Sequence, residues 1–131
     1  MKILTRGGGG YGEVDLFPTG VPATNATVGA SVLSAASMVS GNIFRSGSTG
    51  AYSDTTDTAV AILAALGNPP QGTSVHLTIV NGVAFVETVV AGVGVTLAGV
   101  TANAASAVRD YLITVTSPTT VTLTGIGSRA A

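Results

Sequence analysis

The chain has 131 residues, contains no cysteine and carries a formal net charge of −1, with five Lys and Arg residues against six Asp and Glu residues. This length suffices for one domain with a hydrophobic core of its own. The lack of cysteine excludes disulfides, thiolate metal sites and a cysteine nucleophile. The basic residues are scattered and form no basic stripe, which argues against direct nucleic-acid binding.

Charged residues make up only 8% of the chain, whereas a soluble domain typically has about 25%. A monomer with so few charges is poorly protected from association. We therefore expect much of the surface to be covered by partners in an assembly. Residues 88–108 carry no charge and are long enough to span a membrane, but their glycine, threonine and asparagine content argues against a membrane helix.

The first part of the chain differs from the rest in amino-acid composition. It contains four consecutive glycines at 7–10, Pro18, Pro22 and many isolated small polar residues, and its start lacks the apolar run of a signal peptide. A polyglycine run serves either as a hinge or as backbone pressed against another surface. We expect residues 1–47 to form an extended N-terminal arm or attachment segment, and residues 48–131 to form the folded domain.

The middle of the chain predicts one helix. Residues 28–39 read as a strand or a weak helix, with the strand slightly favoured, and residues 42–46 read as a short strand. At about 58–66, apolar residues recur with helical spacing after Asp57 or Thr58 as a cap, and Gly67 followed by Asn-Pro-Pro ends the helix. The apolar stripe predicts that this helix lies on a sheet.

The remainder predicts strands: residues 75–80 and 83–90, joined by an Asn81-Gly82 hairpin turn, a segment at 93–97, and a hairpin at 110–125 with Pro118 in its turn. In that last hairpin, apolar residues alternate with threonines, as in a half-buried antiparallel ribbon. The predicted fold class is all-β, a mainly antiparallel β-sandwich or jelly-roll-like domain with one short helix and the extended arm.

Motifs that could carry chemistry are weak. Gly7, Gly9 and Gly12 match a dinucleotide-binding spacing, but no strand and helix flank them in the required order. His76 is the only histidine, so one chain cannot assemble a histidine metal site or triad, and we expect His76 at the surface or at a subunit interface. Asp54 and Asp57 resemble calcium donors but lack the rest of a calcium loop, and helix capping explains them. We predict no catalytic residue, cofactor or metal.

Three segments carry a resemblance to a known class of protein. They are STGAYSDTTDTA at 48–59, ILAAL at 62–66 and ITVTSPTTVTLTGIG at 113–127. In the order of these phrases and in composition, the chain resembles capsid decoration (cement) proteins of tailed bacteriophages and similar modules in head fibres. The resemblance implies a β-rich, non-enzymatic structural protein of the virion that binds the capsid exterior as a homotrimer and stabilises the shell, with the major capsid protein as its partner.

The arm is the expected attachment segment, because backbone hydrogen bonds and apolar contacts repeated by threefold symmetry give strong binding. The residues expected to contact the shell are Ile3, Leu4, Arg6, Tyr11, Leu16 and Phe17. The alternative is a head-fibre or tail-associated adhesin module that binds a host surface glycan, for which Tyr11 and Tyr52 are the plausible aromatic contacts.

Overall fold

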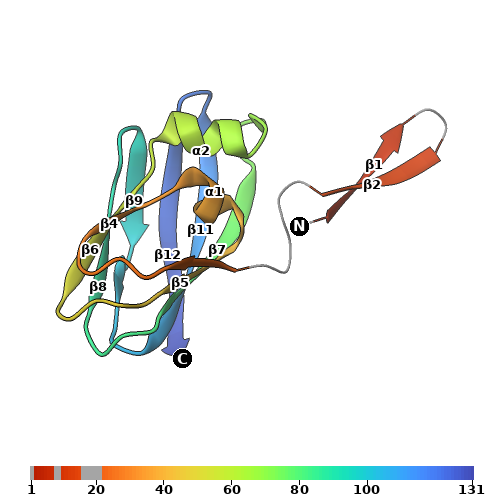
Figure 1. Ribbon diagram of the computed structural model, residues 1–131. Coiled ribbons are helices and arrows are strands. Elements are labelled where there is room, and N and C mark those ends of the chain that lie inside the picture. The colour runs from red at the N-terminus through yellow and green to blue at the C-terminus, as the bar shows by residue number, and fades with distance from the viewer. Residues whose placement is uncertain (1, 8–9, 16–21) are drawn as a thin grey trace.

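The computed structural model describes residues 2–7, 10–15 and 22–131 (Figure 1). Its elements, in chain order, are β1 (Lys2–Gly7), β2 (Gly10–Asp15), β3 (Ala23–Asn25), β4 (Ser31–Leu33), α1 (Ala35–Val39), β5 (Asn42–Arg45), β6 (Tyr52–Thr56), α2 (Ala59–Ala65), β7 (Ser74–Asn81), β8 (Glu87–Val90), β9 (Val95–Gly99), β10 (Ala102–Asn103), β11 (Ala107–Ser117) and β12 (Thr120–Ala130). We call residues 22–131 the body and the β1–β2 pair the ribbon.

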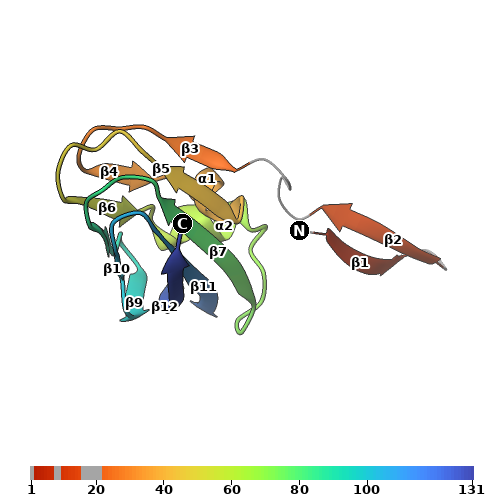
Figure 2. The ribbon, with the colours of Figure 1, turned by 90° about the horizontal axis from the view of Figure 1, so that it is seen from below.

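The body contains two sheets that face each other across one hydrophobic core (Figure 2). The large sheet has six strands in the order β3-β5-β7-β11-β12-β9, and the small sheet has four in the order β10-β8-β6-β4. Both sheets are mixed. The parallel pairs are β3/β5, β5/β7, β9/β12, β4/β6 and β6/β8, and the antiparallel pairs are β7/β11, β11/β12 and β8/β10.

The prediction of an all-β, mainly antiparallel sandwich or jelly roll with one helix is therefore wrong: the fold is mixed α/β, with two short helices in the described part of the chain. The physical reason is the path of the chain, which alternates between the sheets from β3 to β10. From β3 to β8, each strand that follows a pass through the opposite sheet lies parallel to its predecessor in its own sheet, because such a crossover brings the chain back to the starting end.

The helices follow two successive passes through both sheets, β3-β4-α1 and β5-β6-α2. The side chains of Ser34 and Thr58 cap α1 and α2 by accepting hydrogen bonds from backbone N–H groups three residues on. Each helix is followed by a glycine with positive φ, Gly41 and Gly67. The sequence contains no exact repeat, but the structure repeats this unit. The predicted helix is confirmed as α2, whereas residues 28–39 hold both a strand, β4, and a helix, α1.

The core is formed by inward-facing residues of both sheets and by one face of each helix. From β11, the buried residues are Tyr111, Ile113 and Val115, which confirms the alternation predicted for the C-terminal hairpin. This hairpin is the antiparallel pair β11/β12, with Pro118 and Thr119 in the turn. From α2, Ile62 and Leu63 are buried, so the helix packs on the core as predicted.

The hairpin predicted at Asn81-Gly82 is wrong. After β7 the chain enters the small sheet, where β8 pairs with β6 and β10 instead of with β7. Asn81 is buried, and its side-chain amide donates to carbonyl oxygens beyond the turn. The N–H of Gly82 donates to the carbonyl of Arg45 at 2.8 Å, which extends the pairing of β7 with β5. These contacts direct the chain across the core.

Residues 22–47, which belong to the predicted arm, contribute β3 and β5 to the large sheet and β4 to the small sheet. The ribbon is a separate two-stranded antiparallel sheet, in which Lys2 is opposite Asp15 and Gly7 is opposite Gly10. The glycine run therefore joins two strands.

Candidate functional site

Strands β5 and β7 end at the same end of the body, far from the helices (Figure 1). Buried polar side chains gather at this end. We call them the interior polar cluster. Its members, all buried, are Arg45, Tyr52, Asp54, Asn81, Glu87 and Asn103. They come from five strands of both sheets, so the cluster joins the sheets at this end as the hydrophobic core does at the other.

Arg45 is the cation of the cluster. Its Nε and Nη2 donate to the two carboxylate oxygens of Asp54 at 2.6 and 3.0 Å, a forked ion pair with both side chains fully buried. The guanidinium lies 4.5 Å from the ring centre of Tyr52. Its other N–H groups donate to backbone carbonyl oxygens of Asn25, Thr27, Gly29 and Ser46. Burial alone would lower the pKa of Arg45, but the Asp54 carboxylate outweighs burial and raises this pKa above its ordinary value.

Two amides and a phenol extend the cluster. The Tyr52 hydroxyl donates to Oδ1 of Asn81 at 2.7 Å, and burial raises the pKa of Tyr52 well above its ordinary value. Asn81 Nδ2 donates to three carbonyl oxygens, those of Phe85 and Ala104 in the neighbouring loops and that of Asn103 in β10. The amide of Asn81 therefore holds two loops at the end of the body.

Glu87 is the second carboxyl group of the cluster. Asn103 Nδ2 donates to its Oε2 at 3.4 Å, while Glu87 Oε1 and Asn103 Oδ1 have no hydrogen-bond partner. Burial, and then the adjacent Asp54 carboxylate, raise the pKa of Glu87 to about 8. Because Glu87 and Asp54 are fully buried, neither can reach a substrate in solution.

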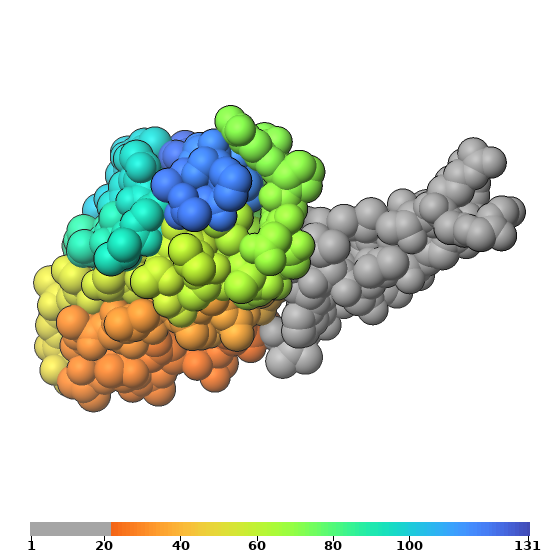
Figure 3. Space-filling view, turned by 90° about the horizontal axis from the view of Figure 1, so that it is seen from above, coloured from red at the N-terminus to blue at the C-terminus, as the bar shows by residue number. Residues whose placement is uncertain are grey.

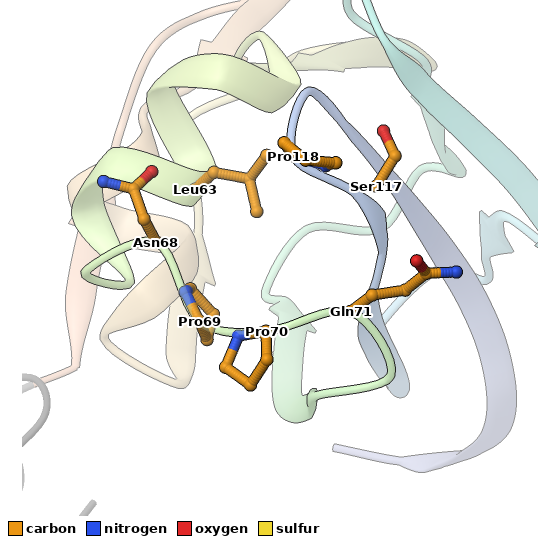
Figure 4. Close-up of a pocket in the computed structure, with 7 residues that line it drawn as sticks. All are labelled: Leu63, Asn68, Pro69, Pro70, Gln71, Ser117 and Pro118. Atoms are coloured by element: carbon orange, nitrogen blue, oxygen red, sulfur yellow. The ribbon is translucent and has the colours of Figure 1, made fainter.

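A surface pocket of about 370 Å³ lies at the opposite end of the body, between the loop after α2 and the β11–β12 turn. Figure 3 shows this turn, in blue, beside the green segment that follows α2. The pocket is lined by Leu63, Asn68, Pro69, Pro70, Gln71, Ser117 and Pro118 (Figure 4). Its lining includes proline rings and amides but no charged or aromatic side chain, so it holds neither an acid–base pair nor an aromatic platform for a sugar.

A second pocket, of about 310 Å³, is lined by Pro22, Thr24, Asn42, Ile43, Phe44 and Val80. It lies over β3, β5 and β7 of the large sheet. Its lining is mostly apolar, and Phe44 is 41% exposed. Like the first pocket, it has no charged lining residue.

His76 lies on β7 with its side chain half exposed, and its Nε2 is 3.4 Å from Oδ1 of Asp110 on β11. Asp110 also accepts hydrogen bonds from Thr78 and Arg129. Partial burial alone would raise the pKa of Asp110, but these two partners outweigh burial and lower this pKa below its ordinary value. This group lines neither pocket described above, and the described residues contain no set of three metal-binding side chains.

Four of the six residues predicted to contact a partner lie in the ribbon. Ile3, Leu4 and Arg6 are in β1, Tyr11 is in β2, and the strand register places Arg6 opposite Tyr11. Leu16 and Phe17 lie outside the described residues. The structure therefore brings the first four together on one small sheet.

The other candidates from the sequence have structural roles. Gly7 ends β1 and Gly12 lies in β2, so a strand, and not a helix, follows the glycine run. Asp54 is held by Arg45, and Asp57 accepts hydrogen bonds from the backbone N–H groups of Ala35 and Thr58. Tyr52, proposed as an aromatic contact for a glycan, is buried.

Sequence reasoning missed Arg45, Glu87 and Asn103. A signal was available for two of them, because Arg45 shares the strand face of the apolar Ile43, and Glu87 shares that of Val89. A charged residue at an inward position of a strand indicates a buried polar contact. Asn103 lies in a strand of two residues and has no such pattern.

Comparison of the chain with protein-family models, curated proteins and solved structures found no match. Among the helices in the described ranges, none has the length and apolarity needed to cross a membrane.

Proposed function

We propose that this protein is a structural component of a virion: a decoration (cement) protein that binds the major capsid protein on the capsid exterior of a tailed bacteriophage as a homotrimer and stabilises the shell. It acts mechanically, without catalysis and without contacting nucleic acid. The ribbon is the attachment element, and the body is the part that remains outside the shell.

The observation that carries the proposal is the division of the chain into a body and a separate two-stranded ribbon. A lone two-stranded sheet is marginally stable in water, and an added strand or an apolar surface stabilises it. A ribbon of six paired positions offers two edges to which a strand of a shell protein can bind by backbone hydrogen bonds. Attachment to a large partner thus supplies the added strand or apolar surface that stabilises a two-stranded ribbon.

The surface of the body supports the same proposal. Arg45, Asp54 and Glu87 are buried, and Asp110 is paired with Arg129, so few charges are left to solvate a chain that has only eleven. Exposed apolar residues are spread over the body and include Val28, Val32, Val60 and Val93. A surface with few free charges suits a subunit that is packed among neighbours.

The test is co-sedimentation with undecorated shells assembled from the major capsid protein of the same virus. We expect the full chain to sediment with the shells and to have the mass of a trimer by light scattering. A variant that lacks residues 1–18 is expected to stay folded by circular dichroism and to remain in the supernatant. Sedimentation of this variant would remove the ribbon from the proposal, and a monomeric full chain that does not bind the shells would overturn the whole proposal.

A further inference from the structure

The interior polar cluster contains two carboxyl groups and a single cation. Arg45 directs its fork at both oxygens of Asp54, so its charge is matched by that one carboxylate. Glu87 has no cation of its own and receives one long hydrogen bond from Asn103. An ionised Glu87 would be a buried charge without a counterion, which proteins avoid because desolvation costs several kcal/mol per ion, on the order of the total stability of a domain.

Two unpaired oxygen atoms point to how the structure avoids this charge. Glu87 Oε1 and Asn103 Oδ1 are both buried without a hydrogen-bond partner, although their residues are already joined by the contact from Nδ2 to Oε2. Both oxygens are acceptors if Glu87 is ionised. A proton on Oε1 turns it into a donor, which can pair with a neighbouring acceptor oxygen, from Asn103 or from Asp54.

We propose that the folded body holds Glu87 as a neutral carboxylic acid, and that ionisation of Glu87 is a pH-sensitive switch that loosens the joint between the two sheets at this end. The acid is neutral while it is buried, and its ionisation creates repulsion with Asp54 across the pair β6/β8. We expect two segments to move when the joint loosens: residues 82–86 before β8, and the short strand β10. This inference is independent of the proposed function.

The ionisable groups that face Glu87 keep their protonation state near neutral pH, so Glu87 is the member of the cluster that titrates there. Asp54 and Tyr52 face it from β6, Arg45 from β5 and Tyr111 from β11. Burial raises the pKa values of both tyrosines, so they stay protonated, and Asp54 raises the pKa of Arg45, so it stays charged. His76 lies elsewhere, paired with Asp110 on the large sheet.

The direction of the effect follows from linkage. The pKa of Glu87 rises from 4.5, its ordinary value, to about 8 in the folded protein. The folded state therefore holds a proton that the unfolded state releases, and this contribution to stability is complete below pH 4.5. It falls as the pH rises from 4.5 to the folded value and is absent above about pH 8.

The first experiment measures the proton directly, and the sequence makes it simple because Glu13 and Glu87 are the only glutamates. Protein labelled with ¹³C at the glutamate carboxyl carbon gives two side-chain signals, and the Glu13→Gln variant identifies that of Glu87. We expect the Glu87 signal to titrate with a midpoint near 8. A midpoint near the ordinary value of 4.5 would overturn the proposal.

The second experiment measures the consequence for stability. Between about pH 5 and pH 8.5, we expect the Tm of the natural chain to fall by roughly 10 °C or more, since each pKa unit of difference corresponds to about 1.4 kcal/mol. The Glu87→Gln variant keeps the shape and has no proton to lose, so its Tm should be nearly constant, and Glu13→Gln is the matched control. Equal pH dependence in the natural chain and a folded Glu87→Gln variant would contradict the switch; if that variant does not fold, the carboxyl titration decides.

Discussion

At the scale of single residues, the body offers two Arg–Asp pairs of the same chemistry and different burial. Arg45 and Asp54 are fully buried, whereas the Arg129 side chain is 59% exposed beside Asp110. Arg45→Ala leaves a buried carboxylate without its cation and leaves backbone carbonyls of the β3–β4 loop unpaired. We expect a loss of about 3–5 kcal/mol in the free energy of unfolding, measured by urea denaturation.

The control for this prediction is Arg129→Ala, which removes an exposed pair and should cost less than about 1 kcal/mol. Equal losses for the two variants would mean that the buried fork contributes no more than a surface ion pair. The difference between them thus measures the effect of burial at constant chemistry.

Residue-scale features of the site were only partly predictable. Of the two residues proposed as the cap of α2, Thr58 is the N-cap, and the carboxylate of Asp57 before it accepts hydrogen bonds from the N–H of Thr58 and from the N–H of Ala35 at the start of α1, 22 positions away. Capping does not explain Asp54, which pairs with Arg45. The partner of Asp54 was not foreseen. Arg45 and Asp54 are nine positions apart on strands of opposite sheets, and no sequence spacing indicates which inward-facing charges will meet across a core.

At the scale of elements, prediction succeeded where the signals were local. The alternation of β11 and β12 and the capped stripe of α2 depend on residues within a few positions of each other, and both elements were found. Helix α1 has only five residues, too few for a helical period to stand out. The prediction of a hairpin turn at Asn81-Gly82 was wrong because Asn81 is a buried hydrogen-bonding residue, a role that has no local sequence signature.

Strand β12 contains a position that tolerates only glycine. A Cβ atom on Gly125 would overlap the carbonyl oxygen of Val100, just beyond the parallel partner strand β9, whereas a Cβ on Gly127 meets nothing within 4 Å. We expect Gly125→Ala to lower the free energy of unfolding by about 1–3 kcal/mol through forced backbone shifts.

Gly127→Ala is the matched control, because it makes the same change two positions along the same strand. Its effect should stay within about 0.5 kcal/mol, as for other unhindered surface changes. Urea denaturation of both variants measures the difference, and similar losses would indicate that strand flexibility, and not the contact with Val100, determines the tolerance of β12.

At the scale of the whole molecule, strands were predicted better than their order. The sequence shows where chain segments alternate, but pairing depends on contacts between residues that are far apart, such as those that place β5 beside β7 with β6 and α2 between them in the chain. The antiparallel fold class followed from assuming that neighbouring strands pair. The chain instead crosses the core at nearly every step, and this path makes the sheets mixed.

The alternating path has a consequence for a chain that is cut. A protease site inserted between β5 and β6, in residues 46–51, would produce two fragments that each contribute strands to both layers. Neither fragment could leave without breaking ladders in the large sheet, β5/β7, and in the small sheet, β4/β6. We expect the cleaved protein to elute from a sizing column as one species and to separate only in denaturant; early separation would show that the covalent chain holds the layers together. The path of the chain through both sheets thus holds the two fragments together without a covalent link. Such fragments are candidates for a split protein whose two parts reassemble on mixing.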